Sequence, residues 1–313
     1  MVDWITILLT IFGLCRFEAV NSVDNAIINA GVLSTMNARY RRFFLVYGIL
    51  FAVFVVRGML PLLIVWSANP SIGPLGAFTG AFSNDPSVLA AVEQSAPVLL
   101  ITGGTFLLFL FFHWWFLEPK SSFVSEKNYT RKVGFWFYAV ASIILMILVW
   151  QAIQVNPLMA LGAVAGSTIF FITDGFKQNA KESERELRKG NLPDLSKLLY
   201  LEVIDATFSI DGVLGAFAFT LSVPLILIGN GLGALVVREM TVHNVDRIKR
   251  YCCLKNGAMY SIFFLGLIMV LNSFGAGIPS WASPLITFGL VGYFFHKSNQ
   301  NLPQTKKKKP SIA

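Results

Sequence analysis

The sequence predicts an all-α polytopic membrane protein with about nine transmembrane helices and an inverted-topology repeat. Three observations predict this class: few charges, a series of long apolar stretches, and an acidic motif that occurs twice. Only 13% of the 313 residues are charged and 55% are apolar, and the mean hydropathy is +0.64, whereas about a quarter of a soluble domain is charged. Most of the chain is therefore expected to lie in lipid.

The apolar stretches give nine expected helices of roughly the length that crosses a bilayer. No Lys or Arg precedes the first stretch, so we interpret it as a retained helix rather than a secretory signal. The first and sixth helices are the least apolar because they contain acidic residues. The expected helices are 4–33, 43–67, 96–117, 133–153, 157–176, 197–221, 223–242, 258–274 and 282–297.

The order of the helices predicts four parts of the chain. Residues 1–117 form a first repeat of three helices, and residues 197–297 form a second repeat of four. Between them, residues 118–196 contain an inserted helix pair and a basic cytoplasmic linker, and no motif in the pair indicates its role. Residues 298–313 are expected to be a basic, disordered cytoplasmic tail.

The basic residues predict the orientation. All but three of the 25 Lys and Arg residues follow the odd-numbered helices, and the connections after the even-numbered helices contain none. Under the positive-inside rule this places the N-terminus outside and the C-terminus in the cytoplasm, as in a cell (inner) membrane. The net charge of +8 is then a topology signal, and no nucleic-acid partner is expected. The three exceptions, inside expected helices, are Arg16, Arg57 and Arg238.

A motif of the form [DE]-x3-S-x-D-[NG] occurs in the first and sixth expected helices. A second match, between residues 55–59 and 236–240, follows each motif in the next helix, so we interpret the halves as homologous. Five crossings separate the two motif helices, which must then run in opposite directions, as in the inverted repeats of secondary transporters. The motifs read Glu18-x3-Ser22-x-Asp24-Asn25 and Asp205-x3-Ser209-x-Asp211-Gly212.

These motif side chains predict a cation site. A carboxylate at the centre of a membrane helix costs about 2.5–3.5 kcal/mol on insertion scales, and such residues usually have a function. Carboxylate, amide and hydroxyl oxygens, with no His or Cys nearby, suit hard divalent cations such as Mn²⁺, Ca²⁺ or Mg²⁺. No resident cofactor is expected. The expected metal ligands are Glu18, Asp24, Asn25, Asp205, Ser209 and Asp211, with Arg57 and Arg238 as candidate counter-charges.

Helix geometry leaves two arrangements open. Six residues at 100° each place the second Asp of a motif about 120° from the first acid, so one regular helix cannot aim both at one ion. In one arrangement the helices are interrupted near residues 22–25 and 209–212, and the interruptions make backbone carbonyls available as ligands. In the other arrangement the acids serve two adjacent sites.

A non-transporting alternative is also open. The acids could form buried ion pairs with the three arginines, in which case the protein is a membrane assembly or stress-response scaffold. An intramembrane protease that uses Asp24 and Asp211 would need a Gly-x-Gly-Asp pattern, which the sequence lacks, so no enzymatic activity is expected. We expect Asp24→Asn and Asp211→Asn each to abolish transport with little loss of folded protein, because removing a buried charge relieves its desolvation cost, whereas ion pairs with the arginines would predict loss of folded protein.

The motifs resemble those of the TerC family of integral membrane proteins, which is grouped with the LysE-like transporters. The resemblance extends to the third expected helix, which contains Gly103-Gly104-Thr105-Phe106-Leu107-Leu108. It implies export of a metal ion, with manganese as the substrate, and an association with tellurium resistance. Export could be coupled to protons. The positions carried over are Glu18, Asp24, Asn25, Asp205, Ser209 and Asp211.

Two features depart from the TerC pattern. Gly212 stands where the second motif of that family usually has Ser, and the inserted helix pair has no counterpart. We therefore interpret the sequence as a divergent branch of that family.

Overall fold

A computed structural model describes residues 4–48, 86–118, 127–189, 193–239 and 254–300, with a few isolated positions between 51 and 76. These residues contain helices and no strand, which confirms the all-α class. Apolar helices long enough to cross a membrane support the expected membrane protein. There are five among the described residues: Trp4–Asn21, Gln94–Leu117, Trp136–Val155, Pro157–Asn179 and Lys255–Ser273.

Described helices overlap every expected span, although much of the expected helix 43–67 lies outside the described residues. The same holds for most of residues 71–95, which the predicted orientation places outside the membrane, and for the tail after residue 300. The elements are α1 (Trp4–Asn21), α2 (Val23–Leu33), α3 (Ala38–Phe43), the π-helix η1 (Phe44–Gly48), α6 (Pro86–Leu117), α7 (Lys127–Val155), α8 (Pro157–Lys189), α9 (Asp194–Ala216), α10 (Val223–Glu239), α12 (Leu254–Ser273) and α13 (Ala282–Gln300).

The main correction to the expected elements concerns α8. It continues to Lys189 rather than ending at residue 176, so the stretch 177–189, expected as part of a linker, is helical. The extension is rich in Lys, Glu and Arg, which are good helix formers although they are not apolar. Hydropathy therefore detects where the apolar part of α8 ends, and not where the helix ends.

Local signals explain the sharp connection between α7 and α8. Asn156 stands between the two helices, and its Oδ1 accepts a hydrogen bond from the amide of Leu158 at 2.9 Å. Pro157 is the first residue of α8, where its missing N–H would have no helical partner in any case. An Asn followed by Pro thus begins α8 one residue after α7 ends.

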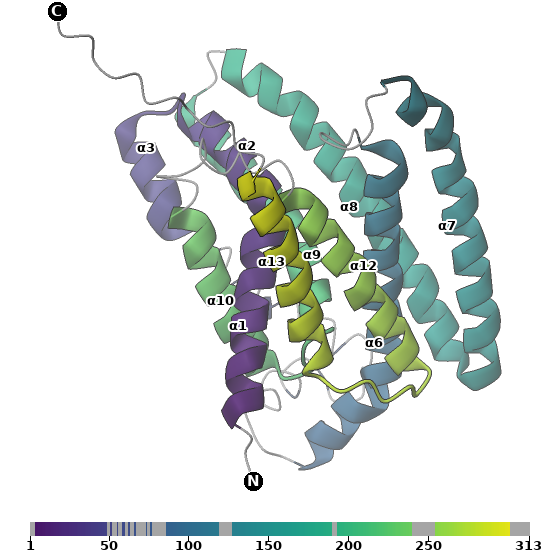
Figure 1. The fold of residues 1–313 in the computed structure, drawn as a ribbon. Coiled ribbons are helices and arrows are strands. Elements are labelled where there is room, and N and C mark those ends of the chain that lie inside the picture. Colours follow the sequence, from purple (N-terminus) through teal and green to yellow (C-terminus); the bar gives the residue numbers. More distant parts are fainter. Residues whose placement is uncertain are drawn as a thin grey trace, which may run out of the picture.

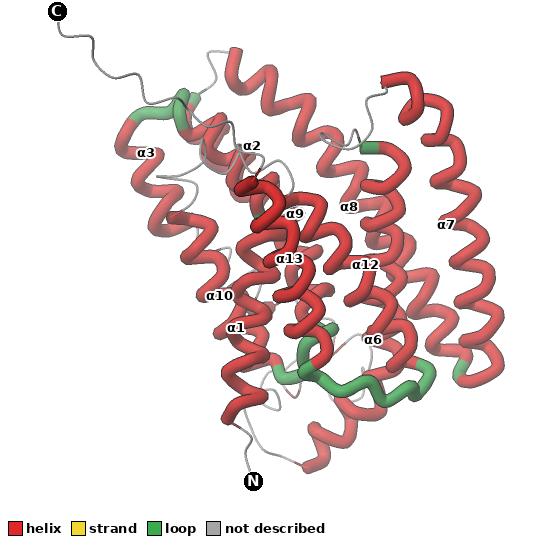
Figure 2. Tube along the Cα trace, in the orientation of Figure 1, coloured by secondary structure: helices red, strands yellow, loops and turns green. Residues whose placement is uncertain are grey.

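The helices form an elongated bundle whose described connections gather at two ends (Figures 1 and 2). The connection between α7 and α8 and the connections 217–222 and 274–281 lie at the end that also holds the N-terminus, and they contain no Lys or Arg. Helix α3, with Arg39, Arg41 and Arg42, lies at the opposite end. The basic residues of these described segments are therefore segregated in space as well as in sequence.

Large apolar side chains cover the outside of the bundle. Met146 and Trp150 on α7 and Leu161 and Ile172 on α8 are all more than half exposed. A soluble protein rarely exposes so much contiguous apolar surface, whereas lipid is a suitable environment for it.

The core between α6, α8 and α12 combines large rings with close backbone contacts. Phe109 and Phe170 are fully buried and meet edge to face, with their ring centroids 5.8 Å apart. At Gly166 of α8, a β-carbon would collide with the backbone carbonyl of Thr102 in α6. Small residues that let two helix backbones approach are typical of membrane helix interfaces.

This close contact predicts that Gly166→Ala destabilises the protein. The new methyl group cannot be accommodated without moving α6 or α8, and overpacking of this kind costs about 1–3 kcal/mol. Gly175→Ala is the matched control on the same helix, since a β-carbon there meets no heavy atom within 4 Å. Thermal unfolding of the detergent-solubilised protein should show a lower midpoint for Gly166→Ala alone. Equal midpoints would contradict the packing described between α6 and α8.

Candidate cation site

The first motif lies at a bend in the chain. Helix α1 ends at Asn21 and α2 begins at Val23, and Ser22 between them has φ −87° and ψ 7°, in the bridge region of backbone conformations. The Ser22 amide still donates to the Glu18 carbonyl at 3.0 Å, and the Ala26 amide to the Ser22 carbonyl at 2.9 Å. The helix is therefore irregular at Ser22, within the stretch where one of the two open arrangements places an interruption, but these two carbonyls are not released.

The second motif lies within a continuous helix. Helix α9 runs from Asp194 to Ala216 with no break at Ser209 or Gly212, so it lacks the interruption that one of the two open arrangements places at residues 209–212. The Ser209 hydroxyl donates to the Asp205 carbonyl at 2.7 Å, a bond within the helix. Asp205 and Asp211 therefore leave α9 in different directions, and the described residues favour two neighbouring sites over one.

The two motifs contact each other reciprocally. The carboxylate of Glu18 lies against Gly212, because a β-carbon at Gly212 would collide with Oε2 of Glu18. Seven residues after Glu18, Asn25 Nδ2 donates to Asp205 Oδ1 at 2.5 Å, and Asp205 stands seven residues before Gly212. The first position of each motif thus meets the last position of the other. The motif helices are adjacent and antiparallel, as their separation along the chain predicts.

Glu18 is held in a narrow space between three helices. Its side chain is on α1 and is only 1% exposed. Gly212 of α9 and Gly233 of α10 leave room for it, since a β-carbon at Gly233 would lie 2.7 Å from Cγ of Glu18. The Ser22 hydroxyl donates to Glu18 Oε1 at 2.5 Å. The glycine that departs from the TerC pattern therefore has a structural reason, because any side chain at position 212 would displace this carboxylate.

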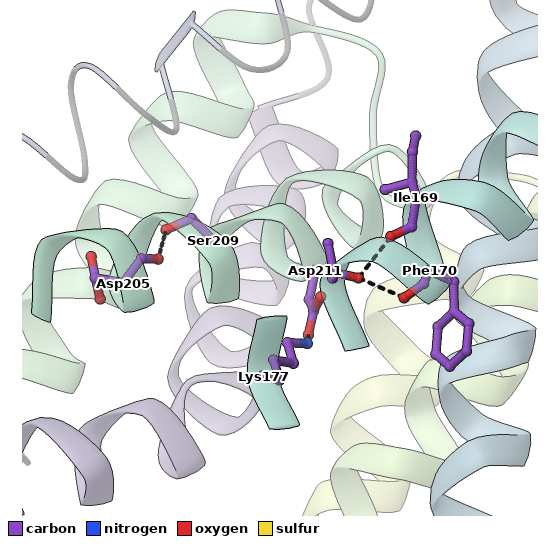
Figure 3. A network of polar contacts seen from close by, with 7 residues as sticks. Ile169, Phe170, Lys177, Asp205, Ser209 and Asp211 are labelled. Atoms are coloured by element: carbon purple, nitrogen blue, oxygen red, sulfur yellow. Dashed lines mark hydrogen bonds and ion pairs between the residues drawn. The ribbon is translucent and has the colours of Figure 1, made fainter. Parts of the chain in front are cut away.

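Asp211 forms an ion pair that the sequence did not indicate. Its Oδ2 contacts Nζ of Lys177 on α8, and Figure 3 shows the two side chains turned toward each other. Asp211 is 4% exposed and the Lys177 side chain 12%. The other carboxylate oxygen, Oδ1, has no hydrogen-bond partner among the described residues.

Lys177 was expected in the linker that follows the inserted helix pair, but it lies within α8. It belongs to the apolar segment Pro157–Asn179 of α8 and follows two buried residues, Phe170 and Thr173, along one side of the helix. This i, i+3, i+7 spacing is the pattern of a buried helix face. Extending the pattern one turn beyond the apolar stretch would have indicated that Lys177 faces the interior.

The remaining expected residues are less informative. The side chains of Asp24 and Arg238, and all of Arg57, lie outside the described part of the chain. Arg16 lies over the rings of Phe12 and Phe288, 5.9 and 5.4 Å from their centroids.

Within the described residues, no three His, Cys, Asp or Glu side chains come together in a group that could hold a metal ion. A bound cation would therefore need amide or hydroxyl oxygens, a movement of side chains, or the side chain of Asp24.

Comparison with known proteins gives one match. A family model described as "Protein of unknown function (DUF475)" matches residues 23–302. That region contains Asn25, Lys177 and the whole second motif, and it begins after Glu18 and Ser22. No curated protein and no solved structure matches the sequence.

The ion pair changes the expected effect of Asp211→Asn. Removing the carboxylate leaves the Lys177 ammonium buried without this partner, and breaking a buried pair in this way costs about 3–5 kcal/mol. We therefore expect Asp211→Asn to lower the folded yield, and the double variant Lys177→Met with Asp211→Asn to recover it. Glu118→Gln is the control, because Glu118 pairs with Lys255 at 2.6 Å in a more exposed position where a pair contributes about 1 kcal/mol or less. Size-exclusion profiles in detergent measure the yield, and a full yield of the single variant would contradict a stabilising pair.

Proposed function

The chain belongs to the family described as "Protein of unknown function (DUF475)", and from its two motifs we propose that it is an integral membrane transporter that exports a divalent cation. The observation that carries the proposal is the reciprocal contact between the two acidic motifs, Glu18 with Gly212 and Asn25 with Asp205. The resemblance to the TerC family supports manganese as the cation and export as the direction. Protons are the proposed coupling ion, because protonation of one or more of the motif acids during the cycle would couple export to the proton gradient.

The reciprocal contact supports an inverted repeat. When a twofold axis relates two segments, residue i of one contacts residue j of the other, and residue j contacts residue i. The motif contacts have this form. We propose nine crossings in which the two repeats meet at these motifs, the arrangement that places cation sites at the repeat interface of many secondary transporters.

The ligands favour a hard cation. Carboxylates of Glu18, Asp205 and Asp211 and the amide of Asn25 supply oxygen donors, which suit Mn²⁺, Ca²⁺ or Mg²⁺. Glu18 and Asp211 form one station, and Asn25 and Asp205 form a second. The two stations are seven residues apart along the first motif and six apart along the second, which is about 9–10 Å at 1.5 Å per residue. A cation would pass from one station to the next.

A scaffold is the second candidate, and a specific observation favours it. Glu18, Asp205 and Asp211 each have a hydrogen-bonding or ionic partner within the protein: Ser22, Asn25 and Lys177. Such contacts would hold the helices together in a membrane assembly or stress-response protein that transports nothing. The two candidates differ in one measurable property, the flux of metal ion.

A flux measurement tests the transporter. In proteoliposomes with a pH gradient, we expect the wild-type protein to move Mn²⁺ faster than protein-free liposomes do. Glu18→Gln and Asp205→Asn should each reduce the flux at least tenfold, about 1.4 kcal/mol. Both substitutions keep the shape of the side chain and its ability to accept the hydrogen bond from Ser22 or Asn25, so folding should be retained. Glu118→Gln at the end of α6 is the control and should transport normally. A folded wild-type protein without flux in either direction would favour the scaffold.

The proposed orientation has its own test. A reporter fused after Ala313 should be active in the cytoplasm, and a reporter inserted in residues 71–95 should be active outside, because alternate connections carry the basic residues. A cytoplasmic signal from the 71–95 insertion would contradict the proposed number of crossings.

A further inference from the structure

Helix α8 supplies a positively charged side chain, Lys177, to the candidate site. Nζ of Lys177 contacts Oδ2 of Asp211, and both side chains are largely buried. Oδ1 of Asp211 is buried and has no hydrogen-bond partner among the described residues. The Asp211 carboxylate therefore has one oxygen held by an ammonium group and one oxygen open to a further ligand.

The surroundings of Lys177 are acidic. Asp174 lies one turn earlier on α8, where it accepts a hydrogen bond from Gln178 at 2.6 Å and lies 3.4 Å from Nε2 of His113 on α6. On the other side, Glu18 of α1 contacts Gly212, the residue after Asp211. The Lys177–Asp211 pair therefore has a second carboxylate one turn earlier on α8 and a third beside the residue that follows Asp211, and negative charges near the pair favour additional cation binding.

We propose that, in the cation-free protein, Lys177 occupies the position that the transported divalent cation takes at Asp211, so that the lysine and the cation bind alternately. The inference rests on the proposed function, because it needs a cation that enters this site. Lysine suits the role, since its ammonium is a compact charge on a flexible four-carbon stem that can withdraw. The role also gives the helix pair 127–189 a purpose, because α8 carries the competing charge.

Competition has a definite consequence for affinity. The entering cation must break the ion pair with Asp211, so the affinity of the wild-type site is lower than that of the same site without the lysine. After the cation leaves, Lys177 returns and compensates the charge of Asp211. The lysine thus weakens binding and promotes release. A lysine that serves only as a structural partner would not weaken binding, and its loss would leave the affinity unchanged or reduce it.

Substitution of Lys177 tests the competition. Calorimetric titration of the full-length purified protein with Mn²⁺ alone should give a Kd for Lys177→Gln at least tenfold below that of the wild type. Lys177→Arg should give a Kd above that of the wild type, because a guanidinium keeps its charge and binds a carboxylate with two hydrogen bonds. In proteoliposomes, Lys177→Gln should release Mn²⁺ more slowly. Lys255→Gln, which removes a Lys–Glu pair outside the site, should match the wild-type Kd.

Each outcome separates the competition from the proposed function. A folded Lys177→Gln variant with a Kd equal to or above that of the wild type overturns the competition, even if the wild type transports Mn²⁺. If Lys177→Gln does not fold, Lys177→Arg decides, and a Kd at or below the wild-type value overturns the competition. Tight binding by Lys177→Gln with no flux in the wild type supports the competition and contradicts transport. If neither the wild type nor Lys177→Gln binds Mn²⁺, both proposals fail.

Discussion

An ionised carboxylate inside a membrane-spanning bundle must be compensated, and this constraint organises the centre of the protein. Burying an uncompensated charge away from water is costly, and the described acids of the two motifs avoid that cost in different ways. Glu18 accepts a hydrogen bond from Ser22, Asp205 accepts one from Asn25, and Asp211 pairs with Lys177. Two of these partners come from a different helix than the acid, so compensation of charge also fixes α2 and α8 against α9.

The two motifs occupy equivalent places without having equivalent chemistry. At the last motif position, Asn25 donates a hydrogen bond to the acid of the other motif, whereas Gly212 provides only space for Glu18. An Asn at one of these matching positions and a Gly at the other make the two stations unequal. A difference of this kind is useful to a transporter, because the affinity on the two sides of the interface need not be the same.

Helix α8 connects the outer part of the molecule to this centre. It packs along α6 through Gly166 and the ring of Phe170, and its later turns bring Lys177 to Asp211. The chain segment between the motifs is therefore part of the site rather than an addition beside it. Any movement of α8 relative to α9 would change the distance between the Lys177 ammonium and the Asp211 carboxylate. Helix packing is therefore coupled directly to the charge of the site.

The sequence by itself determined the properties that depend on composition and order. Few charges and long apolar stretches specify membrane helices, and the number of crossings between the motifs specifies that Glu18 and Asp205 lie on antiparallel helices. Only the tertiary structure decided that α9 is continuous at Gly212, because that glycine serves the approach of Glu18 rather than a break in its own helix. Likewise, the role of Lys177 depends on where α8 packs, since a lysine beyond an apolar stretch has the same local sequence whether it faces water or a carboxylate. Which residues of distant helices become partners depends on how those helices pack, and no local sequence pattern contains that information.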